Sequence, residues 1–283
     1  MAHTFSITSL PTLDRYFFEG EPAPYVLLGS CGIFTSVMLA TLGADVFYSG
    51  PHGDGFDEAL TAPIRAAGVR IELFHLPGPR ATLELRFNAA GEMAFFERIR
   101  GIEANFTAEH LPPAFWEGAI YWVGTCPTQV QQAVARRGKS QGTPVCLTTQ
   151  KKYTGRLDSL LEVTPYLSTL FTNNTEARTW SRSEAGDASL HSVLERLRES
   201  SPGLRIVITR GARGAWLIEG EDFYSVPAAP VSELRYSIGA GDTFAANLAY
   251  ALHTGLPVET ALRRAVTAAA IKMRAVGYFE PPR

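Results

Sequence analysis

The stretch YSIGAGDTFAANLAYAL, residues 236–252, sets two glycines and an alanine directly before an aspartate and then begins an apolar stripe. The apolar positions have helical spacing and predict a packed helix: Phe244, Leu248 and Leu252. The N-terminus of a helix carries unpaired N–H groups and the positive end of the helix dipole. Glycines before such an end let a phosphate oxygen approach the backbone without meeting a Cβ atom. The stretch therefore predicts an anion site at Gly239, Ala240 and Gly241.

Asp242 follows this corner and is expected in the first helical turn, where a negative charge is favoured. A carboxylate there would repel a phosphate. It is suited to take a proton from an alcohol that attacks the phosphate, while neighbouring amides stabilise the transferring group. Two other interpretations stay open, a simple helix cap by Asp242 and Thr243 or a loose dinucleotide fingerprint, Gly239-x-Gly241-x-x-x-Ala245. The fingerprint should directly follow an apolar strand, whereas RYS precedes the corner, and the P-loop pattern GxxxxGK[ST] is absent.

Strands and helices alternate along the rest of the chain. We expect strands at 25–28, 44–50, 69–76, 119–125, 144–149, 169–173 and 204–211, and two more in AWLIEG and DFYSVPA. We expect helices at about 33–42, 56–68, 128–138, 188–200 and 258–277, besides the one that the corner opens. This alternation predicts βαβ units, and hence an α/β fold with a mostly parallel sheet between two layers of helices.

Residues 81–99, ATLELRFNAAGEMAFFERI, break this rhythm and alternate as two strands joined by the turn NAAGE. Leu83, Leu85 and Phe87 fall on one face of this hairpin, and Thr82, Glu84 and Arg86 on the other. No linker, internal repeat or low-complexity tract divides the chain. We expect one domain over residues 1–283, with a small β lid from about 5–20 and 81–99. The open edge of the hairpin suggests a homodimer through the lid.

Composition excludes several classes of partner. The 283 residues are 46% hydrophobic and 19% charged, an ordinary globular mix. Lys plus Arg total 26 against 28 acidic residues, so bulk charge attracts neither nucleic acid nor an anionic membrane. Three scattered cysteines without a CxxC motif indicate a reducing compartment, and no His–Cys spacing predicts a zinc site. The first ten residues have no signal-peptide pattern, so we expect a cytoplasmic protein.

The uncharged stretch from Tyr25 to Ala44 approaches the length of a membrane span. Glycines, serines and threonines interrupt it, so we interpret it as a strand, a glycine turn and a buried helix.

The corner resembles the GAGD signature of the ribokinase-like (PfkB) family of sugar and nucleoside kinases. Other segments resemble motifs of that family in the same order along the chain. NNTEA (173–177) is similar to its NxxE motif, TRGARGA (209–215) to its nucleotide loop, and AVTAAAIKMRAVG (265–277) to the closing helix beside the adenine. TLDRYF (12–17) and LGADVFYSGPHGDGF (42–56) resemble segments on its substrate side. GAGD alone is moderately specific, but the ordered set makes the resemblance strong.

The resemblance implies transfer of the ATP γ-phosphoryl group to an alcohol of a sugar or sugar-like small molecule, with Mg²⁺ as cofactor. Asp242 would be the base, beside an anion hole of Gly239, Ala240 and Gly241. Asn173 and Glu176 would organise magnesium and phosphates, with Glu176 acting through water. The other implied residues are Thr209, Gly211 and Gly214 for the nucleotide, and Asp14, Gly29, Ser30 and Phe34 for the acceptor.

Taken alone, each of these segments has a simpler interpretation. Asn173 and Glu176 could be the N-cap and third residue of an ordinary helix. The residues from Thr209 to Gly214 could be a turn between two strands, and Asp14 could be a surface turn residue.

Departures from the family pattern cluster on the substrate side. Phe34 stands where the family has an asparagine, so it is either a changed pocket wall or part of the core. Gly55 replaces the second aspartate of the GdD segment. Thr148 stands where an aspartate often ends the strand, although Gln150 resembles a related DxQ version. Tyr236-Ser237-Ile238 replaces an Asp-Thr-Thr whose aspartate helps to hold a monovalent cation, which leaves potassium activation open.

Because the catalytic corner is intact, we predict an active kinase with an uncommon substrate. An aromatic similar to Phe34 in inositol-kinase-like relatives keeps a polyol acceptor in consideration. The alternatives are an inositol or nucleoside kinase of the same fold, a non-catalytic small-molecule-binding relative and, with least support, a hydride-transfer enzyme. The sequence identifies neither the acceptor nor the phosphoryl donor.

Overall fold

The computed structural model describes residues 4–88, 93–99, 101–150, 157–180, 186–231, 234, 236–275 and 277–278. Within this part of the chain, nine strands form a large sheet in the order β13-β12-β11-β10-β9-β8-β1-β4-β5. In that order the strands span Asp222–Val226, Ala215–Glu219, Arg205–Thr209, Thr169–Asn173, Val145–Thr148, Ile120–Val123, Phe5–Thr8, Val46–Asp54 and Val69–Pro79. The pairs from β11 to β5 are parallel, and β12 and β13 are antiparallel additions.

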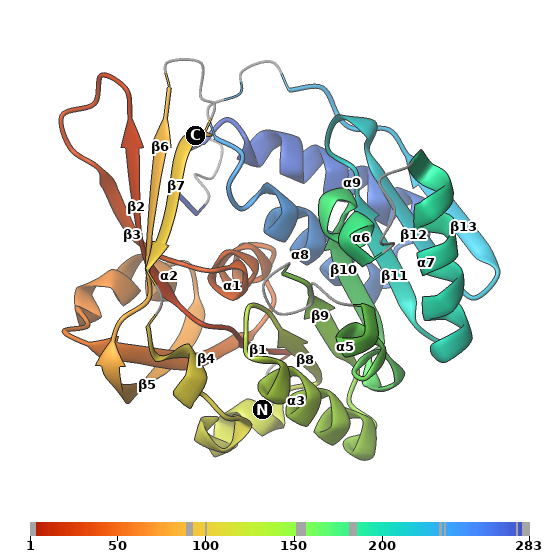
Figure 1. The fold of residues 1–283 in the computed structure, drawn as a ribbon, viewed down its shortest axis with the longest axis horizontal. Coiled ribbons are helices and arrows are strands. Elements are labelled where there is room, and N and C mark those ends of the chain that lie inside the picture. Colours follow the sequence, from red (N-terminus) through yellow and green to blue (C-terminus); the bar gives the residue numbers. More distant parts are fainter. Residues whose placement is uncertain are drawn as a thin grey trace.

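Helices cover both faces of the large sheet, as Figure 1 shows. One face packs against α1, α2, α8 and α9, which span Cys31–Thr41, Ala62–Ala66, Ala240–His253 and Val258–Lys272. The other packs against α3, α5, α6 and α7, which span Thr128–Gln141, Leu157–Leu161, Asn174–Trp180 and Gly186–Ser200. The predicted three-layer α/β architecture is confirmed.

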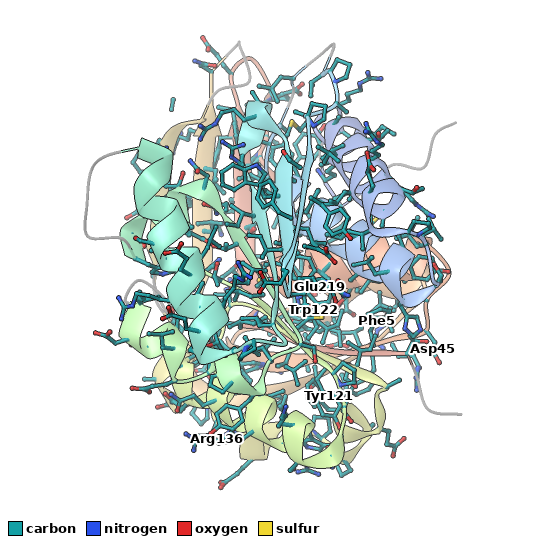
Figure 2. All side chains as sticks on the ribbon, turned by 90° about the vertical axis from the view of Figure 1, so that its right-hand side faces the viewer. Phe5, Asp45, Tyr121, Trp122, Arg136 and Glu219 are labelled. Carbon is teal, nitrogen blue, oxygen red and sulfur yellow. The ribbon has the colours of Figure 1, made fainter. Side chains whose placement is uncertain are left out.

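The centre of the sheet is closely packed, and its apolar side chains are fully enclosed. Phe5 and Trp122 are 0% exposed, and Figure 2 shows both inside the molecule, whereas Arg136 lies at its surface. The Trp122 ring stacks on Phe171 with the centroids 5.0 Å apart, and its Nε1–H donates to Thr148 Oγ1 at 3.0 Å. The buried core thereby fixes a polar side chain at the carboxyl end of β9.

A second, four-stranded sheet has the order β3-β2-β6-β7 and stands beside the large one (Figure 1). Its strands span Tyr25–Gly29, Thr12–Phe18, Thr82–Phe87 and Met93–Ile99. The register pairs Asp14 with Leu83, and Leu83 with Arg98. This register confirms the predicted alternation of residues 82–87, while the expected turn at 89–92 lies outside the described residues.

The small sheet differs from the expected lid in two respects. Residues 5–8 form β1 in the middle of the large sheet, because all four are buried and pair on both sides with parallel strands. The strand predicted at 25–28, which the expected lid did not include, forms the edge strand β3 and pairs antiparallel with β2. The chain therefore enters the small sheet at Thr12 and returns through β3 to the start of α1.

No helix in the described ranges is long and apolar enough to cross a membrane.

Candidate active site

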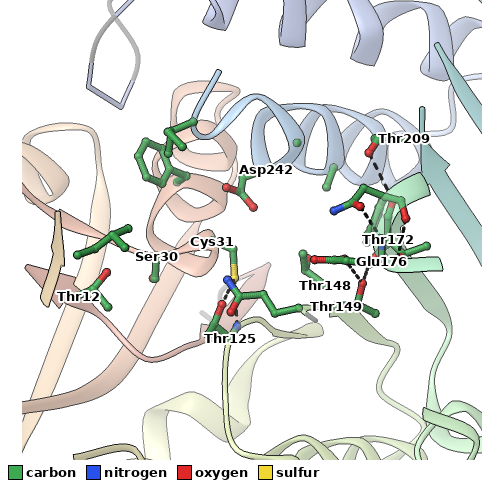
Figure 3. Close-up of a pocket in the computed structure, with 18 of the residues that line it drawn as sticks. Thr12, Ser30, Cys31, Thr125, Thr148, Thr149, Thr172, Glu176, Thr209 and Asp242 are labelled. Carbon is green, nitrogen blue, oxygen red and sulfur yellow. Dashed lines mark hydrogen bonds between the residues drawn. The ribbon is translucent and has the colours of Figure 1, made fainter. Parts of the chain in front are cut away.

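A cavity of about 340 Å³ lies where the carboxyl ends of β9, β10 and β11 face the small sheet. The start of α1, the start of α8 and the inner face of β6 and β7 close its other sides. Figure 3 shows Asp242 near its middle, Glu176 on one side, and Thr12 and Ser30 on the other. Open α/β sheets bind ligands at this edge.

The predicted corner begins α8. Gly239 is the N-cap residue and has a left-handed φ of 78°. A Cβ atom there would come within 2.7 Å of the Phe34 ring, so the tight approach of the corner to α1 requires glycine. The Ala240 N–H already donates to Ser237 O at 3.3 Å. Of the three residues of the predicted anion site, Gly241 is the one that lines the cavity.

Asp242 lies in the first turn of α8 and points into the cavity (Figure 3). Withdrawal from solvent and the nearby Glu176 carboxylate raise its pKa to about 7, and the Lys272 ammonium opposes this rise. A carboxyl group with a pKa near neutrality can both accept and release a proton, which is the property that general-base catalysis needs.

Glu176 and Asn173 lie at the carboxyl end of β10. The Glu176 N–H donates to Asn173 Oδ1 at 2.9 Å, so Asn173 does cap α6, as the simpler interpretation held. The same cap turns the Glu176 side chain into the cavity, where Oε2 accepts from Thr149 Oγ1 at 2.6 Å. Capping and a ligand role are therefore compatible, because the cap sets the direction of the carboxylate.

Magnesium fits the oxygen atoms at this end of the cavity. Glu176 offers a carboxylate, and Asn173 also lines the cavity with an amide. The described residues contain no group of three His, Cys, Asp or Glu side chains that could hold a metal alone. A magnesium ion here would depend on phosphate and water oxygens for most of its coordination, as this ion commonly does.

The predicted nucleotide loop follows β11. Thr209 lines the cavity, and its Oγ1 donates to Thr172 O at 3.5 Å. Gly211 and Gly214 lie beyond it in a tight turn with φ values of 58° and 86°. A Cβ atom on Gly214 would meet Val226 O at 1.9 Å, so the entry into β12 explains this glycine without a ligand.

Asp14 lies at the opposite end and is buried rather than in a surface turn. Its carboxylate accepts from Thr12 Oγ1 at 2.5 Å and from Tyr16 Oη at 2.7 Å. Burial raises the pKa of Asp14 to about 7, although these two hydrogen bonds lower it. Gly29 faces it across the strand pair, and a Cβ atom on Gly29 would lie 1.8 Å from Asp14 Oδ2. Gly29 therefore makes room for this carboxylate.

Ser30 and Phe34 complete the predicted acceptor end. Ser30 caps α1 by accepting from the Ile33 N–H at 3.3 Å, and its hydroxyl lies 2.7 Å from Ser9 Oγ. Phe34 is 4% exposed and packs with Tyr278, yet it also lines the cavity. Phe34 therefore belongs to the core and also contributes to the cavity wall, while its role toward an acceptor stays a prediction.

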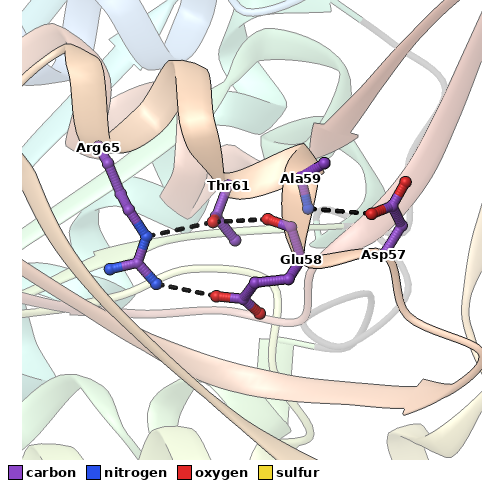
Figure 4. Close-up of polar contacts among 5 residues, drawn as sticks. All are labelled: Asp57, Glu58, Ala59, Thr61 and Arg65. Carbon is purple, nitrogen blue, oxygen red and sulfur yellow. Dashed lines mark hydrogen bonds and ion pairs between the residues drawn. The ribbon is translucent and has the colours of Figure 1, made fainter.

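The 42–56 segment turns away from the cavity. Asp54 is exposed, and its carboxylate accepts from His75 Nε2 at 2.8 Å and from the Gly78 N–H at 3.2 Å. Asp54 does not line the cavity. The next residues form a surface cluster (Figure 4), in which Asp57 caps a 3-10 turn and Arg65 bonds Glu58 at 2.9 Å. Local capping thus explains the polar residues after Gly55.

Several residues that line the cavity or lie behind it did not stand out in the sequence. Arg98 reaches the cavity from β7, and the alternation of 93–99 could have put it on the inner face with Phe96. Cys31 and Thr125 contact each other at 3.1 Å across 94 positions, a pairing that no local pattern signals. Lys272 is fully buried behind the corner although its sequence context is that of an exposed helix residue.

Comparison with known proteins agrees with this geometry. Residues 29–281 match the family described as pfkB family carbohydrate kinase. The chain belongs to the PfkB family. Adenosine kinase of Saccharomyces cerevisiae is 24% identical over 258 residues, which are 85% of this chain and 75% of that protein.

Solved structures confirm the ribokinase-like fold. A probable sugar kinase from Rhizobium etli superposes with a TM-score of 0.85 at 16% identity, over 98% of this chain and 94% of the other. Ribokinase of Arabidopsis thaliana, solved with ribose and ATP, superposes with a TM-score of 0.82 at 19% identity, over the same shares. The PfkB protein is therefore a phosphotransferase that acts on an alcohol group, and the hydride-transfer interpretation loses its basis.

The Gly29→Ala substitution tests the contact between β3 and Asp14. Because the new methyl group would overlap the carboxylate, we expect the free energy of unfolding to fall by about 1–3 kcal/mol, as in other overpacked sites. Urea denaturation measures this. Gly203→Ala is the matched control, since nothing lies within 4 Å of its Cβ position. Equal stability of the two variants would contradict the tight packing of Asp14.

Proposed function

We propose that this PfkB protein transfers the γ-phosphoryl group of ATP to a hydroxyl of a small polyhydroxylated molecule. The observation that carries the proposal is the position of Asp242, between a cavity end with Glu176 and an end with Thr12, whose hydroxyl donates to Asp14. The first end suits a magnesium-bound nucleotide, and the second suits an acceptor rich in hydroxyl groups.

In the proposed reaction the acceptor hydroxyl lies beside Asp242 and gives its proton to the carboxylate. The hydroxyl oxygen forms a bond to the γ-phosphorus while the bond to the bridging oxygen breaks, and ADP leaves with that electron pair. The positive end of α8 and the N–H groups of its first turn lie where charge accumulates on the transferring group. Magnesium, held near Glu176 and Asn173, would neutralise phosphate charge.

Asp14 would hold the acceptor by accepting hydrogen bonds from its hydroxyl groups. Thr12 and Tyr16 already donate to Asp14, so the carboxylate is fixed before a ligand arrives. A carboxylate that needs no reorganisation positions the acceptor at low entropic cost.

The walls between the two ends favour a nucleoside as one acceptor class. Leu83, Leu85 and Phe96 come from the small sheet, and Ile238 from the segment before α8. Such apolar walls suit the flat face of a base, while a sugar hydroxyl points to Asp242. The adenosine kinase relative agrees with this class, and ribokinase agrees with a free sugar.

The decisive test measures ADP release with Mg-ATP against pentoses, hexoses, inositols and nucleosides, for the native protein and for Asp242→Asn. We expect acceptor-dependent turnover that falls about 10²–10⁴-fold in the variant, the usual contribution of a general base. Nucleotide binding by calorimetry should persist. Asp222→Asn, at an exposed position, is the matched control.

Folding is a separate readout for Asp242→Asn. The raised pKa means that ionised Asp242 destabilises the folded state as pH rises from about 4 towards 7. The variant should therefore melt no lower than the native protein at pH 8. Near-normal turnover in Asp242→Asn would refute the mechanism. Binding of nucleotide and acceptor without phosphoryl transfer would instead support the non-catalytic alternative.

The pH profile gives a further prediction. Since the base must be ionised, kcat/KM for the acceptor should rise with pH through about 7, where Asp242 and Asp14 lose their protons. In Glu176→Gln the negative charge beside Asp242 is lost, so the residual activity should rise at lower pH than in the native protein. An unchanged pH profile in Glu176→Gln would show that the rise in kcat/KM reports the ionisation of a group other than Asp242.

We also infer that the outer face of the small sheet joins two copies of the chain. Phe95 and Ile99 are 44% and 51% exposed on β7, which has an open edge, and Val26 is 47% exposed on β3 at the opposite edge of the sheet. Light scattering should give twice the chain mass, and Phe95→Glu should give the monomer. A native monomer at micromolar concentration would contradict the inference.

A further inference from the structure

Lys272 is a buried cation directly behind the catalytic corner. It is the last residue of α9, its side chain is 0% exposed, and Nζ donates to Ala275 O at 3.0 Å. Within the described residues this is its one hydrogen bond, although an ammonium has three donors. A buried charge with so few partners costs more free energy than an apolar side chain would, so folding alone does not explain it.

Aromatic rings supply the rest of its surroundings. Nζ lies 4.6 Å from the ring centroid of Tyr236 and 5.9 Å from that of Phe34. Both distances are in the range where the negative face of a ring attracts a cation. Phe34 also touches Gly239, so the ammonium, the ring and the glycine corner form one packed unit.

The backbone ties the ammonium to the start of α8. The Tyr236 N–H donates to Met273 O at 3.1 Å, which joins the segment before the corner to the end of α9. Burial lowers the pKa of Lys272 to about 8, and the nearby Asp242 carboxylate opposes this shift, while the ammonium opposes the rise in the pKa of Asp242. The cation therefore adds to the positive potential of the helix N-terminus.

The residues present do not fit the monovalent cation that the family resemblance implies beside this corner. Tyr236 stands in place of the family's aspartate and offers a ring in place of a carboxylate. The Ala275 carbonyl, a natural ligand for such an ion, already accepts from the ammonium. A second cation bound here would be repelled by Lys272 at short range.

We propose that the Lys272 ammonium takes the place of a bound monovalent cation and that this kinase works without potassium. Lys272 is a positioning residue, since it lies behind the corner and supplies a fixed positive charge to the anion site through α8. The inference rests on the proposed phosphoryl transfer at that corner. Its consequence is a site that the potassium concentration does not regulate.

The first test measures turnover of the native protein in choline, sodium, potassium, ammonium and caesium chloride at constant ionic strength. We expect rates that agree within about twofold, since bulk salt should act on this site only by screening. A saturable rise of fivefold or more with potassium, absent with choline, would overturn the proposal.

The second test removes the charge. Lys272→Met keeps the length of the side chain, and we expect kcat to fall at least about tenfold, with nucleotide affinity unchanged, because a charge that favours the transition state is lost. Lys139→Met, at an exposed position of α3, should keep native turnover. A folded Lys272→Met protein with native kcat would overturn the proposal.

Chemical rescue separates an electrostatic role from a packing role. Lys272→Ala leaves room for a small cation beside the Ala275 carbonyl, so ammonium or potassium should restore turnover saturably and raise the melting temperature. Choline should do neither. Thermal unfolding reports cation binding even if no acceptor supports turnover, so a failure of the proposed kinase reaction is distinguishable from a failure of this inference. A folded Lys272→Ala protein that gains neither activity nor stability from these ions would count against it.

Discussion

The site depends on one constraint: a carboxylate at the positive end of a helix must be able to gain and lose a proton near neutral pH, although it is largely shielded from water. Asp242 meets this constraint in the first turn of α8, where burial and Glu176 disfavour its charge and the helix terminus and Lys272 favour it. The balance brings its pKa to about 7. The close approach of Gly239 to the Phe34 ring sets the start of α8 against α1, and Lys272 lies buried behind it.

The two ends of the cavity are fixed by hydroxyl groups in a similar way. Thr149 donates to Glu176, and Thr12 and Tyr16 donate to Asp14. Each carboxylate is thus oriented by a strand of a different sheet, Glu176 near the large sheet and Asp14 within the small one. Relative movement of the two sheets would change the distance between these ends without disturbing either carboxylate, which is consistent with the small sheet acting as a lid.

Local patterns predicted most of the fold, because the alternating strands and helices carry strong apolar periodicity. They did not show which sheet a strand joins. The strand predicted at 25–28 is present, but pairing with β2 places it at the edge of the small sheet, where Tyr25 is 49% exposed. The motifs located Asp242, Glu176 and Asp14. Lys272 could not be found this way, since its burial depends on a carbonyl three residues later and on the distant ring of Tyr236.

The most direct test of the account is a crystal structure with Mg²⁺, a non-hydrolysable ATP analogue and the acceptor that supports turnover. We expect the reacting hydroxyl oxygen within about 2.6–3.2 Å of an Asp242 carboxylate oxygen, the reach of a general base. We also expect the γ-phosphate at the Gly241 N–H and the magnesium on the side of Glu176. A reacting hydroxyl remote from Asp242, or a nucleotide at the Asp14 end of the cavity, would contradict the proposed mechanism.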